Sequence, residues 1–205
     1  MNREQLELKL QGKFGATTGA ILLFIIEVLQ IVIISSAIII PIRYFLVQPF
    51  YVKGASMEPN FYDHEYLVID ELSYRLREPV RGEIVVFRYP RDPSQFFIKR
   101  VIGLPGETVE VTGGNILLYN DEHPNGLKLD ETYLPTDLRT NGKDRVTLGD
   151  GEYYVMGDNR NESLDSRSFG AIHLTDVIGR VWVRGLPLSR VGTFTAPEYT
   201  QDTTE

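Results

Sequence analysis

The chain contains no cysteine and only three histidines. The lack of cysteine excludes disulfides, thiolate metal sites and a cysteine nucleophile. A histidine-based hydrolase would need His64, His123 or His173 beside a carboxylate, and none of them stands in a recognised motif. Replacing each histidine by alanine is therefore expected to leave any activity intact.

The chain also lacks an excess of positive charge. It has 21 Lys and Arg against 28 Asp and Glu, a formal net charge of -7. No overall basic field attracts nucleic-acid phosphates, so nucleic acid is not an expected partner. At 205 residues with 42% hydrophobic residues, the chain can bury one ordinary core and carry one further element.

One long apolar run, Ala20 to Ile42, lies near the N-terminus. About 20 apolar residues cross a bilayer, so the sequence predicts a single transmembrane helix within an anchor region at 20–47. Glu27 conflicts with a central position, because a carboxylate there costs roughly 2.5 to 3.5 kcal/mol on insertion scales. We therefore expect Glu27 near an interface and a hydrocarbon span from about Val28 to Val47.

A cleavable signal peptide is the alternative interpretation of this run. Its apolar core would be about 7 to 15 residues long and would end at an Ala-x-Ala pattern, which Ile38 to Pro41 do not provide. The basic residues near the run are Arg3, Lys9 and Lys13 before it and Arg43 and Lys53 after it. This slight bias predicts a cytoplasmic segment at 1–19 and a soluble part outside the cytoplasm.

Beyond the anchor, short apolar or alternating runs are separated by turn residues, which is typical of antiparallel strands. The strands are predicted at 66–69, 83–89, 96–102, 108–111, 116–119, 152–156 and 177–183. The fold class is therefore a mainly β, antiparallel domain at 48–192 behind one N-terminal transmembrane helix. Residues 120–150 are expected to form a polar excursion and residues 193–205 a mobile tail.

Ser56 follows the anchor closely, between small residues and ahead of Pro59. A tight turn there would point backbone N–H groups at a developing oxyanion. A serine hydroxyl is a poor nucleophile until a neighbouring base takes its proton. Ser56 is thus a candidate nucleophile, and an ordinary turn serine is the alternative.

Lys99 is the candidate base for Ser56. Strand alternation puts it on the face of Phe97 and Val101, while Arg100 takes the opposite face, and alternation alone does not say which cation points inward. Chemistry prefers lysine, because arginine stays protonated whereas burial brings a lysine pKa from about 10.4 toward roughly 7 to 8. A solvated strand lysine is the alternative.

A third group of polar residues runs from Met156 to Gly170 and is dense in Asp, Asn, Ser and Arg. Such a composition favours a rigid hydrogen-bonded network that orients a base. A calcium-binding loop is the alternative, but the regular ligand spacing and terminal Glu of an EF-hand are missing. Neither a metal nor a cofactor is expected.

Taken together, these motifs resemble those of bacterial type I signal peptidases, also called leader peptidases. The resemblance runs from the membrane segment to about Gly192. It rests on Ser56-Met-Glu-Pro59, on Arg81 to Pro90 leading to Ile98 to Gly106, and on Gly157 to Arg160 with Ser163, Asp165, Ser166 and Arg167.

The resemblance implies that Ser56 attacks the scissile carbonyl, that Lys99 is the general base and that Ser163 hydrogen-bonds and orients the lysine amine. The Ser56 N–H would be an oxyanion donor. Many family members add a serine hydroxyl two positions before the nucleophile, where this chain has Gly54. The matching structural positions, expected to hold the site by ion pairs, are Asp158, Arg160, Asp165 and Arg167; Glu162 replaces a more usual asparagine.

The resemblance further implies a substrate, the C-terminal region of the signal peptide of an exported preprotein, bound as an added strand. The matching pocket positions are Gly54, Met57, Phe61, Phe97 and Ile98 for the residue before the cut, and Phe50 and Val86 for the residue two positions earlier. Bulky walls there would select Ala-x-Ala. The enzyme would be a single-pass protein of the bacterial cell membrane that contacts lipid, with its catalytic domain on the extracytoplasmic side.

Two other interpretations stay open from sequence alone. A self-cleaving Ser/Lys repressor-type protease would carry a DNA-binding helical domain and its own Ala-Gly cleavage site in place of the N-terminal span. A non-enzymatic membrane-anchored β module, or an inactive relative, would keep the fold without the activity.

Overall fold

A computed structural model describes residues 3–45, 47–197 and 199 of the chain. The chain divides into two compact units, residues 1–46 and 47–205.

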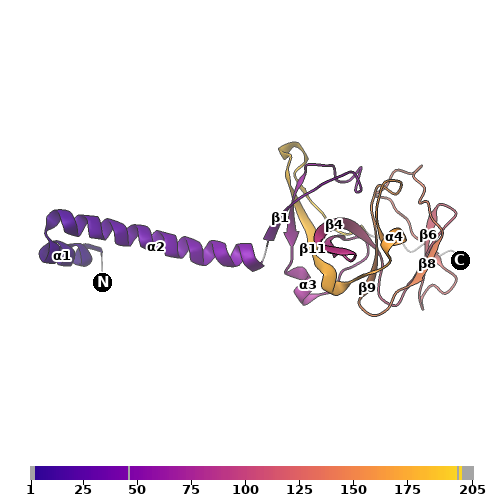
Figure 1. Cartoon of the computed structure of the whole chain (residues 1–205), viewed down its shortest axis with the longest axis horizontal. Coiled ribbons are helices and arrows are strands. Elements are labelled where there is room, and N and C mark those ends of the chain that lie inside the picture. Colours follow the sequence, from indigo (N-terminus) through magenta and orange to yellow (C-terminus); the bar gives the residue numbers. More distant parts are fainter. Residues whose placement is uncertain (1–2, 46, 198, 200–205) are drawn as a thin grey trace. The chain divides into compact units, whose positions relative to one another are not determined.

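The first unit is helical (Figure 1). Helix α1 spans Arg3–Phe14 and helix α2 spans Ala16–Phe45, with Gly15 at φ +83° between them. Only glycine adopts that angle without strain, so Gly15 lets the chain turn from one helix into the next.

Helix α2 is long and apolar enough to cross a membrane. The stretch Ala16–Ile40 has 25 residues and a mean hydropathy of 2.7. The predicted span to Val47 runs past the end of the helix, because α2 ends at Phe45 and Val47 begins a strand. Glu27 lies within the apolar stretch Ala16–Ile40, and its depth in a bilayer stays a prediction.

The second unit is built on two antiparallel sheets. The larger sheet has the order β1-β2-β11-β3-β4-β9-β10, and β12 also pairs with β11. Its strands are β1 (Val47–Tyr51), β2 (Tyr66–Asp70), β3 (Ile84–Tyr89), β4 (Asp92–Gly103), β9 (Glu152–Met156), β10 (Ile172–His173), β11 (Val177–Leu186) and β12 (Gly192–Thr193). The fold class predicted from the sequence is confirmed.

The smaller sheet has the order β7-β6-β5-β8. Its strands are β5 (Thr108–Thr112), β6 (Asn115–Tyr119), β7 (Leu127–Lys128) and β8 (Asp144–Thr147). The expected polar excursion therefore contributes two edge strands. Four one-turn helices complete the unit: α3 (Ser73–Leu76), α4 (Ser166–Phe169), η1 (Leu174–Asp176) and η2 (Leu188–Arg190).

Strand β3 is buried on both faces and organises the core. Ile84 and Val86 pack into one apolar cluster with Leu67 and Ile69, while Val85 and Phe87 pack into a second. Its continuous Ile-Val-Val-Phe run reflects this double burial. A third cluster fills the space where β5 and β6 of the smaller sheet meet β4 and β9.

The C-terminal segment corrects the prediction of a mobile tail from Thr193. Thr193 pairs with Val183 in β12, and the Phe194 ring lies 4.5 Å from the Phe61 ring, centroid to centroid. Tyr199 packs against the third cluster. The packed domain thus extends beyond residue 192, because two aromatic side chains in a polar segment find apolar contacts.

We expect Phe194→Ala to lower the free energy of unfolding by about 1–2 kcal/mol, since the half-buried ring leaves a gap beside Phe61. Thermal denaturation of the detergent-solubilised chain measures this. Thr195→Ala is the matched control, because Thr195 is exposed and should stay within about 0.5 kcal/mol of wild type. Equal stability of both variants would contradict the packed segment.

Candidate active site

Ser56 lies in a turn that follows β1, and this turn is anchored at several points. Buried Met57 and Phe61 fasten it to the core. The Glu58 N–H donates to the Ala55 carbonyl (3.1 Å). Gly54 sits at φ +89°, an angle that favours glycine. Its N–H donates to the Asp63 carboxylate (2.9 Å), so the turn has little freedom to move.

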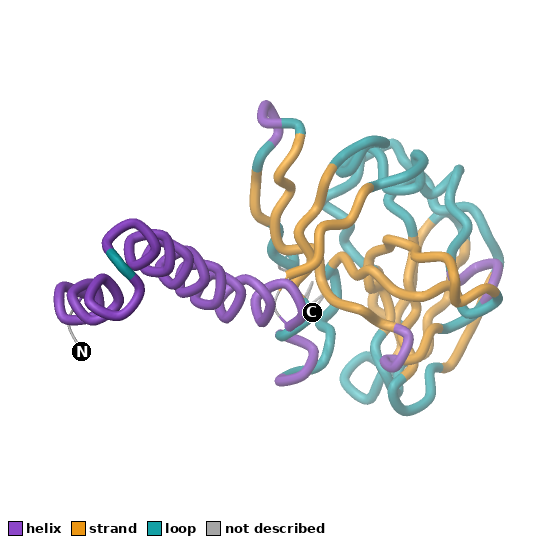
Figure 2. Tube along the Cα trace, turned by 60° about the vertical axis from the view of Figure 1, so that its left-hand side comes forward, coloured by secondary structure: helices purple, strands orange, loops and turns teal. Residues whose placement is uncertain are grey.

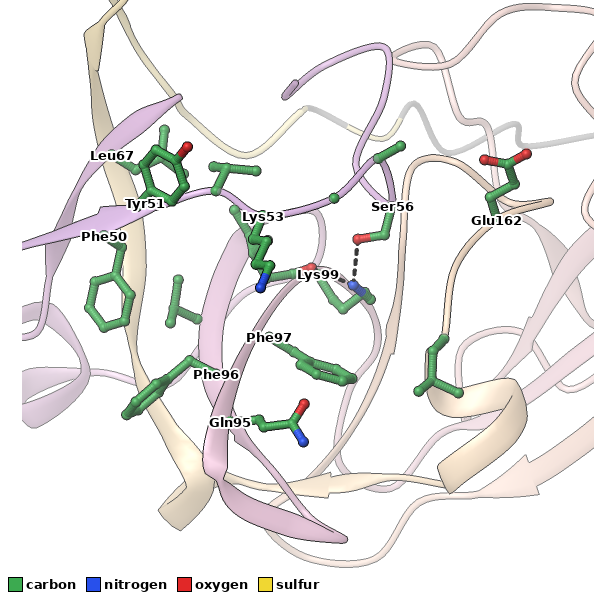
Figure 3. Close-up of a pocket in the computed structure, with 16 residues that line it drawn as sticks. Phe50, Tyr51, Lys53, Ser56, Leu67, Gln95, Phe96, Phe97, Lys99 and Glu162 are labelled. Atoms are coloured by element: carbon green, nitrogen blue, oxygen red, sulfur yellow. Dashed lines mark hydrogen bonds between the residues drawn. The ribbon is translucent and has the colours of Figure 1, made fainter. Parts of the chain in front are cut away.

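Lys99 comes from β4 and reaches Ser56 across the groove (Figure 3). Its Nζ is hydrogen-bonded to Ser56 Oγ at 2.8 Å and donates to the Ile98 carbonyl at 2.8 Å. The Phe97 ring lies 5.4 Å from Nζ, and Lys99 is only 3% exposed. A buried amine is thus held against a hydroxyl, which is the geometry of a nucleophile and its base.

Burial lowers the pKa of Lys99 to about 8, although the negative charges of Asp165 and Asp158 work in the opposite direction. Near that pH a substantial fraction of the amine is neutral and can accept a proton. The value agrees with the range expected from the sequence.

Arg100, the next residue on β4, is also buried but has a different partner. Its guanidinium donates from Nε and Nη2 to Asp158 at 2.8 and 2.6 Å, and it stacks 3.9 Å from the Tyr133 ring. Asn60 donates to the same carboxylate at 2.8 Å. Sequence alternation left open which cation faces the nucleophile, and the structure places Lys99 there.

The other expected ion pairs are also formed, with partners that the sequence did not identify. Arg160 is paired with Glu131 and donates to Thr140 Oγ1 (2.8 Å) and the Gly157 carbonyl (2.9 Å). Glu131 lies in the polar excursion, so Arg160 ties that segment to the site loop.

Asp165 closes the loop on its other side. Arg167 donates to it from Nε and Nη2, both at 2.8 Å, and the Gly157 N–H donates at 3.1 Å. Burial alone would raise the pKa of Asp165, but hydrogen bonds and charge from Arg167 outweigh it and lower that pKa. The negative charge of Asp165 is therefore paired with the guanidinium of Arg167.

Ser163 does not make the expected hydrogen bond to Lys99. Its hydroxyl oxygen is buried and has no bond of normal geometry to any residue that the structure describes. A Cβ on Gly157 would lie 2.2 Å from Ser163 Oγ and 2.4 Å from the Ser56 carbonyl oxygen. Ser163 therefore packs beside the nucleophile's backbone, in a space that only glycine at position 157 leaves open.

A pocket of about 480 Å³ opens in front of Ser56 and Lys99 (Figure 3). Of the predicted pocket residues, it is lined by Phe50, Gly54, Val86, Phe97 and Ile98. Met57 and Phe61 do not line it, because their side chains turn into the core beneath the turn. The lining residues that the sequence analysis missed are Tyr51, Val52, Lys53, Ala55, Leu67, Gln95, Phe96, Glu162 and Leu164.

One wall of this groove is an unpaired stretch of strand. Strand β9 pairs with β4 at Arg100, Val101 and Gly103. Among the described strands, none pairs with β4 on that side before Arg100. The backbone before Lys99 is thus open to an extended peptide on the side of the pocket.

The hydrogen bonds around Ser56 determine which backbone N–H groups are available to an oxyanion. Within the described residues the Ser56 N–H has no acceptor, whereas the Ser56 carbonyl accepts from the Asn159 N–H (3.0 Å). The Gly54 N–H already donates a hydrogen bond to the Asp63 carboxylate. The Ser56 N–H is therefore available as a donor to an oxyanion, and the Gly54 N–H is not.

The three histidines lie outside the groove. His64 contacts Asp63 (Nε2 to Oδ2, 3.3 Å) and His173 contacts Glu152 (3.6 Å), but neither bonds to Ser56, and His123 sits in the loop before β7. A serine beside a buried lysine, with no histidine at the site among the described residues, defines the class of Ser/Lys hydrolases.

Comparisons with known proteins agree with this class and specify the family. The model of the family described as "Signal peptidase, peptidase S26" matches residues 25–185. The chain belongs to this family, whose members are serine endopeptidases with a Ser/Lys dyad. The resemblance read from the motifs is confirmed.

Two curated relatives support the same family. The chain is 41% identical to a probable signal peptidase I-2 of Synechocystis, over 76% of this chain and 71% of that protein. It is 36% identical to a signal peptidase I of Leptolyngbya laminosa, over 84% and 85% respectively. A crystal structure of a signal peptidase I from Enterococcus faecalis overlaps 51% of this chain and 97% of its own, with 32% identity and a TM-score of 0.43.

Replacing Lys99 by methionine tests the burial of the amine without reference to activity. The unfolded chain holds the lysine proton up to about pH 10.5, and the folded chain releases it near pH 8. Between those values the unfolded state binds more protons, so wild-type stability rises with pH, by about 3 kcal/mol from this group.

Lys99→Met should accordingly be more stable than wild type at pH 7, and the difference should shrink as the pH rises from 8 to 10.5. Denaturant titration of both proteins at pH 7, 8.5 and 10 measures it, with Lys128→Met on the exposed side of β7 as control. A difference that does not change with pH would mean that the Lys99 pKa is not lowered.

Proposed function

We propose that this chain is a membrane-anchored serine endopeptidase that removes signal peptides from exported preproteins by cutting after an Ala-x-Ala-like motif. Ser56 is the nucleophile and Lys99 the general base. The observation that carries the proposal is the 2.8 Å contact between Ser56 Oγ and an amine whose pKa burial lowers to about 8.

In the proposed mechanism the neutral Lys99 amine takes the Ser56 proton as Oγ attacks the scissile carbonyl carbon. The Ser56 N–H donates to the oxyanion that forms, since within the described chain it has no other acceptor. The protonated lysine then gives its proton to the departing amine. A water molecule, deprotonated by the same amine, hydrolyses the acyl-enzyme.

The groove supports the choice of substrate. An extended peptide adds to the open edge of β4 before Lys99, opposite the segment from Phe50 to Ala55. The Phe50 and Phe96 rings contact each other edge to face across the groove, with ring centroids 5.6 Å apart, which narrows the groove and disfavours large side chains. Small residues at alternate positions fit walls built from Phe50, Val86, Phe97 and Ile98.

Membrane anchoring is proposed from the apolar α2 and from apolar residues exposed on the catalytic domain. Tyr51, Tyr66 and Leu186 are neighbours across β1, β2 and β11, and each is more than 40% exposed. Leu188 in η2, 79% exposed, lies at the tip of the projecting β11–β12 hairpin (Figure 2). Tyr51 also lines the groove, so lipid contact at this surface would bring the groove to membrane-held substrate.

The proposed orientation has a cytoplasmic N-terminus and the catalytic domain on the outer side of the bacterial cell membrane. Ser56 is the eleventh residue after the end of α2. Such tethering raises the effective concentration of a substrate anchored in the same membrane.

The direct test is cleavage of a preprotein by the purified chain, with the cut mapped by mass spectrometry. Ser56→Ala and Lys99→Ala are each expected to reduce the rate by at least about a thousandfold, because neither half of the dyad works without the other. Ser163→Ala should weaken cleavage, because the Ser163 side chain packs beside the Ser56 backbone, while Ser94→Ala, on an exposed part of β4, should not. A Lys99→Ala protein that cleaves at the wild-type rate would refute the assignment of the base.

The pH dependence of the rate tests the protonation state of the base. Because the active amine is neutral, kcat/KM should rise with pH with a slope of one and reach half its maximum near pH 8. Steady-state rates from pH 6 to 10 on one peptide measure this. An acidic limb near pH 6.5 that disappears on replacing His64 would instead indicate a histidine base.

A further inference from the structure

Two opposite charges flank the nucleophile along the groove. Of the residues that line it, only Lys53, Lys99 and Glu162 carry a basic or acidic side chain. Figure 3 shows Lys53 projecting into the groove between Phe50 and Ser56, and Glu162 on the far side of Ser56 from Phe50. A peptide lying along the groove therefore passes a positive charge, then the nucleophile, then a negative charge.

Both charges are exposed, and neither is neutralised by the protein. Within the described residues, no ion pair or side-chain hydrogen bond involves the Lys53 amine or the Glu162 carboxylate. The buried carboxylates Asp158 and Asp165 are, in contrast, paired with arginines. Lys53 and Glu162 are thus free to interact with a bound peptide.

The position of Glu162 is fixed relative to Ser56. Its backbone N–H donates to Asn159 Oδ1 (3.3 Å). Asn159 in turn donates from its N–H to the Ser56 carbonyl (3.0 Å) and from Nδ2 to the Ala55 carbonyl (3.2 Å). The loop that carries Glu162 is therefore bonded directly to the nucleophile turn.

We propose that Lys53 and Glu162 select the charge of the substrate on the two sides of the cut. This inference rests on the proposed function, in which the segment from Phe50 to Ser56 holds the residues before the cut. Lys53 then favours an acidic residue at the middle position of Ala-x-Ala. Glu162 favours a basic residue at the start of the mature protein and disfavours an acidic one.

Two peptides of identical composition test this proposal with the full chain in detergent. One carries Ala-Glu-Ala before the cut and Lys after it, and the other carries Ala-Lys-Ala before the cut and Glu after it. Since an exposed charge pair contributes about a two- to threefold factor, the two pairs together should make wild type cleave the first peptide with a kcat/KM about four- to ninefold higher at low salt. At about 0.5 M salt the ratio should fall toward one.

Variants assign the ratio to the two side chains. Glu162→Gln and Lys53→Gln should each reduce it about two- to threefold, and the double exchange Lys53→Glu with Glu162→Lys should invert it. A ratio within one protein cancels any general loss of activity. Glu162→Asp and Lys53→Arg keep both charges, so they must keep the direction of the preference. These two variants test the proposal even if the double exchange variant fails to fold.

The matched control is Glu122→Gln. It removes the same charge from an exposed glutamate that does not line the groove, so it should leave the ratio unchanged. A wild-type ratio near one, or a ratio unaffected by both Glu162→Gln and Lys53→Gln, overturns the proposal. If wild type fails to cut even the neutral peptide Ala-Gln-Ala followed by Gln, the proposed function itself falls and takes this inference with it.

Discussion

The site depends on one constraint, the burial of the Lys99 amine against the Ser56 hydroxyl. An amine in water keeps its proton at neutral pH and cannot act as a base. Phe97 and the walls of the groove exclude water from it, while the Ile98 carbonyl and Ser56 Oγ give it hydrogen bonds in place of those it loses. The fold therefore gives up stability at this residue, and in the proposed mechanism the neutral amine that results activates Ser56.

The surrounding arginines act on the same balance. Asp158 and Asp165 both attract a proton to Lys99, so each works against the lowered pKa. Arg100 binds Asp158 in a two-point contact, and Arg167 does the same for Asp165. By compensating these charges the ion pairs do more than hold the loop, because they limit how strongly two buried carboxylates oppose the neutral amine.

Much of this arrangement could be predicted from the sequence, since the predicted strand runs fall on strands and alternation separates Lys99 from Arg100. Side chains in the turn could not be oriented this way, because a turn has no period. For this reason the sequence does not reveal that Met57 and Phe61 point into the core and not into the pocket. Strand β1 is absent from the predicted strands, and its first residue, Val47, continues the apolar run and was assigned to the anchor region. The packing of the C-terminal segment is not predicted from the sequence, because isolated aromatic residues give no periodic signal.

The boundary between Lys99 and Arg100 shows why the two cations are not interchangeable. They are consecutive on β4, both are nearly fully buried, and each has a hydrogen-bonded partner. Arg100 lies where β9 begins to pair with β4 and has a carboxylate partner, so its charge is permanent and structural. Lys99 lies where that pairing has ended and has only neutral partners, so its charge can be lost. Exchanging the two would put an arginine that cannot be deprotonated beside Ser56 and a point charge where Asp158 accepts a planar two-point donor. Both the proposed base and the ion pair with Asp158 would then be lost.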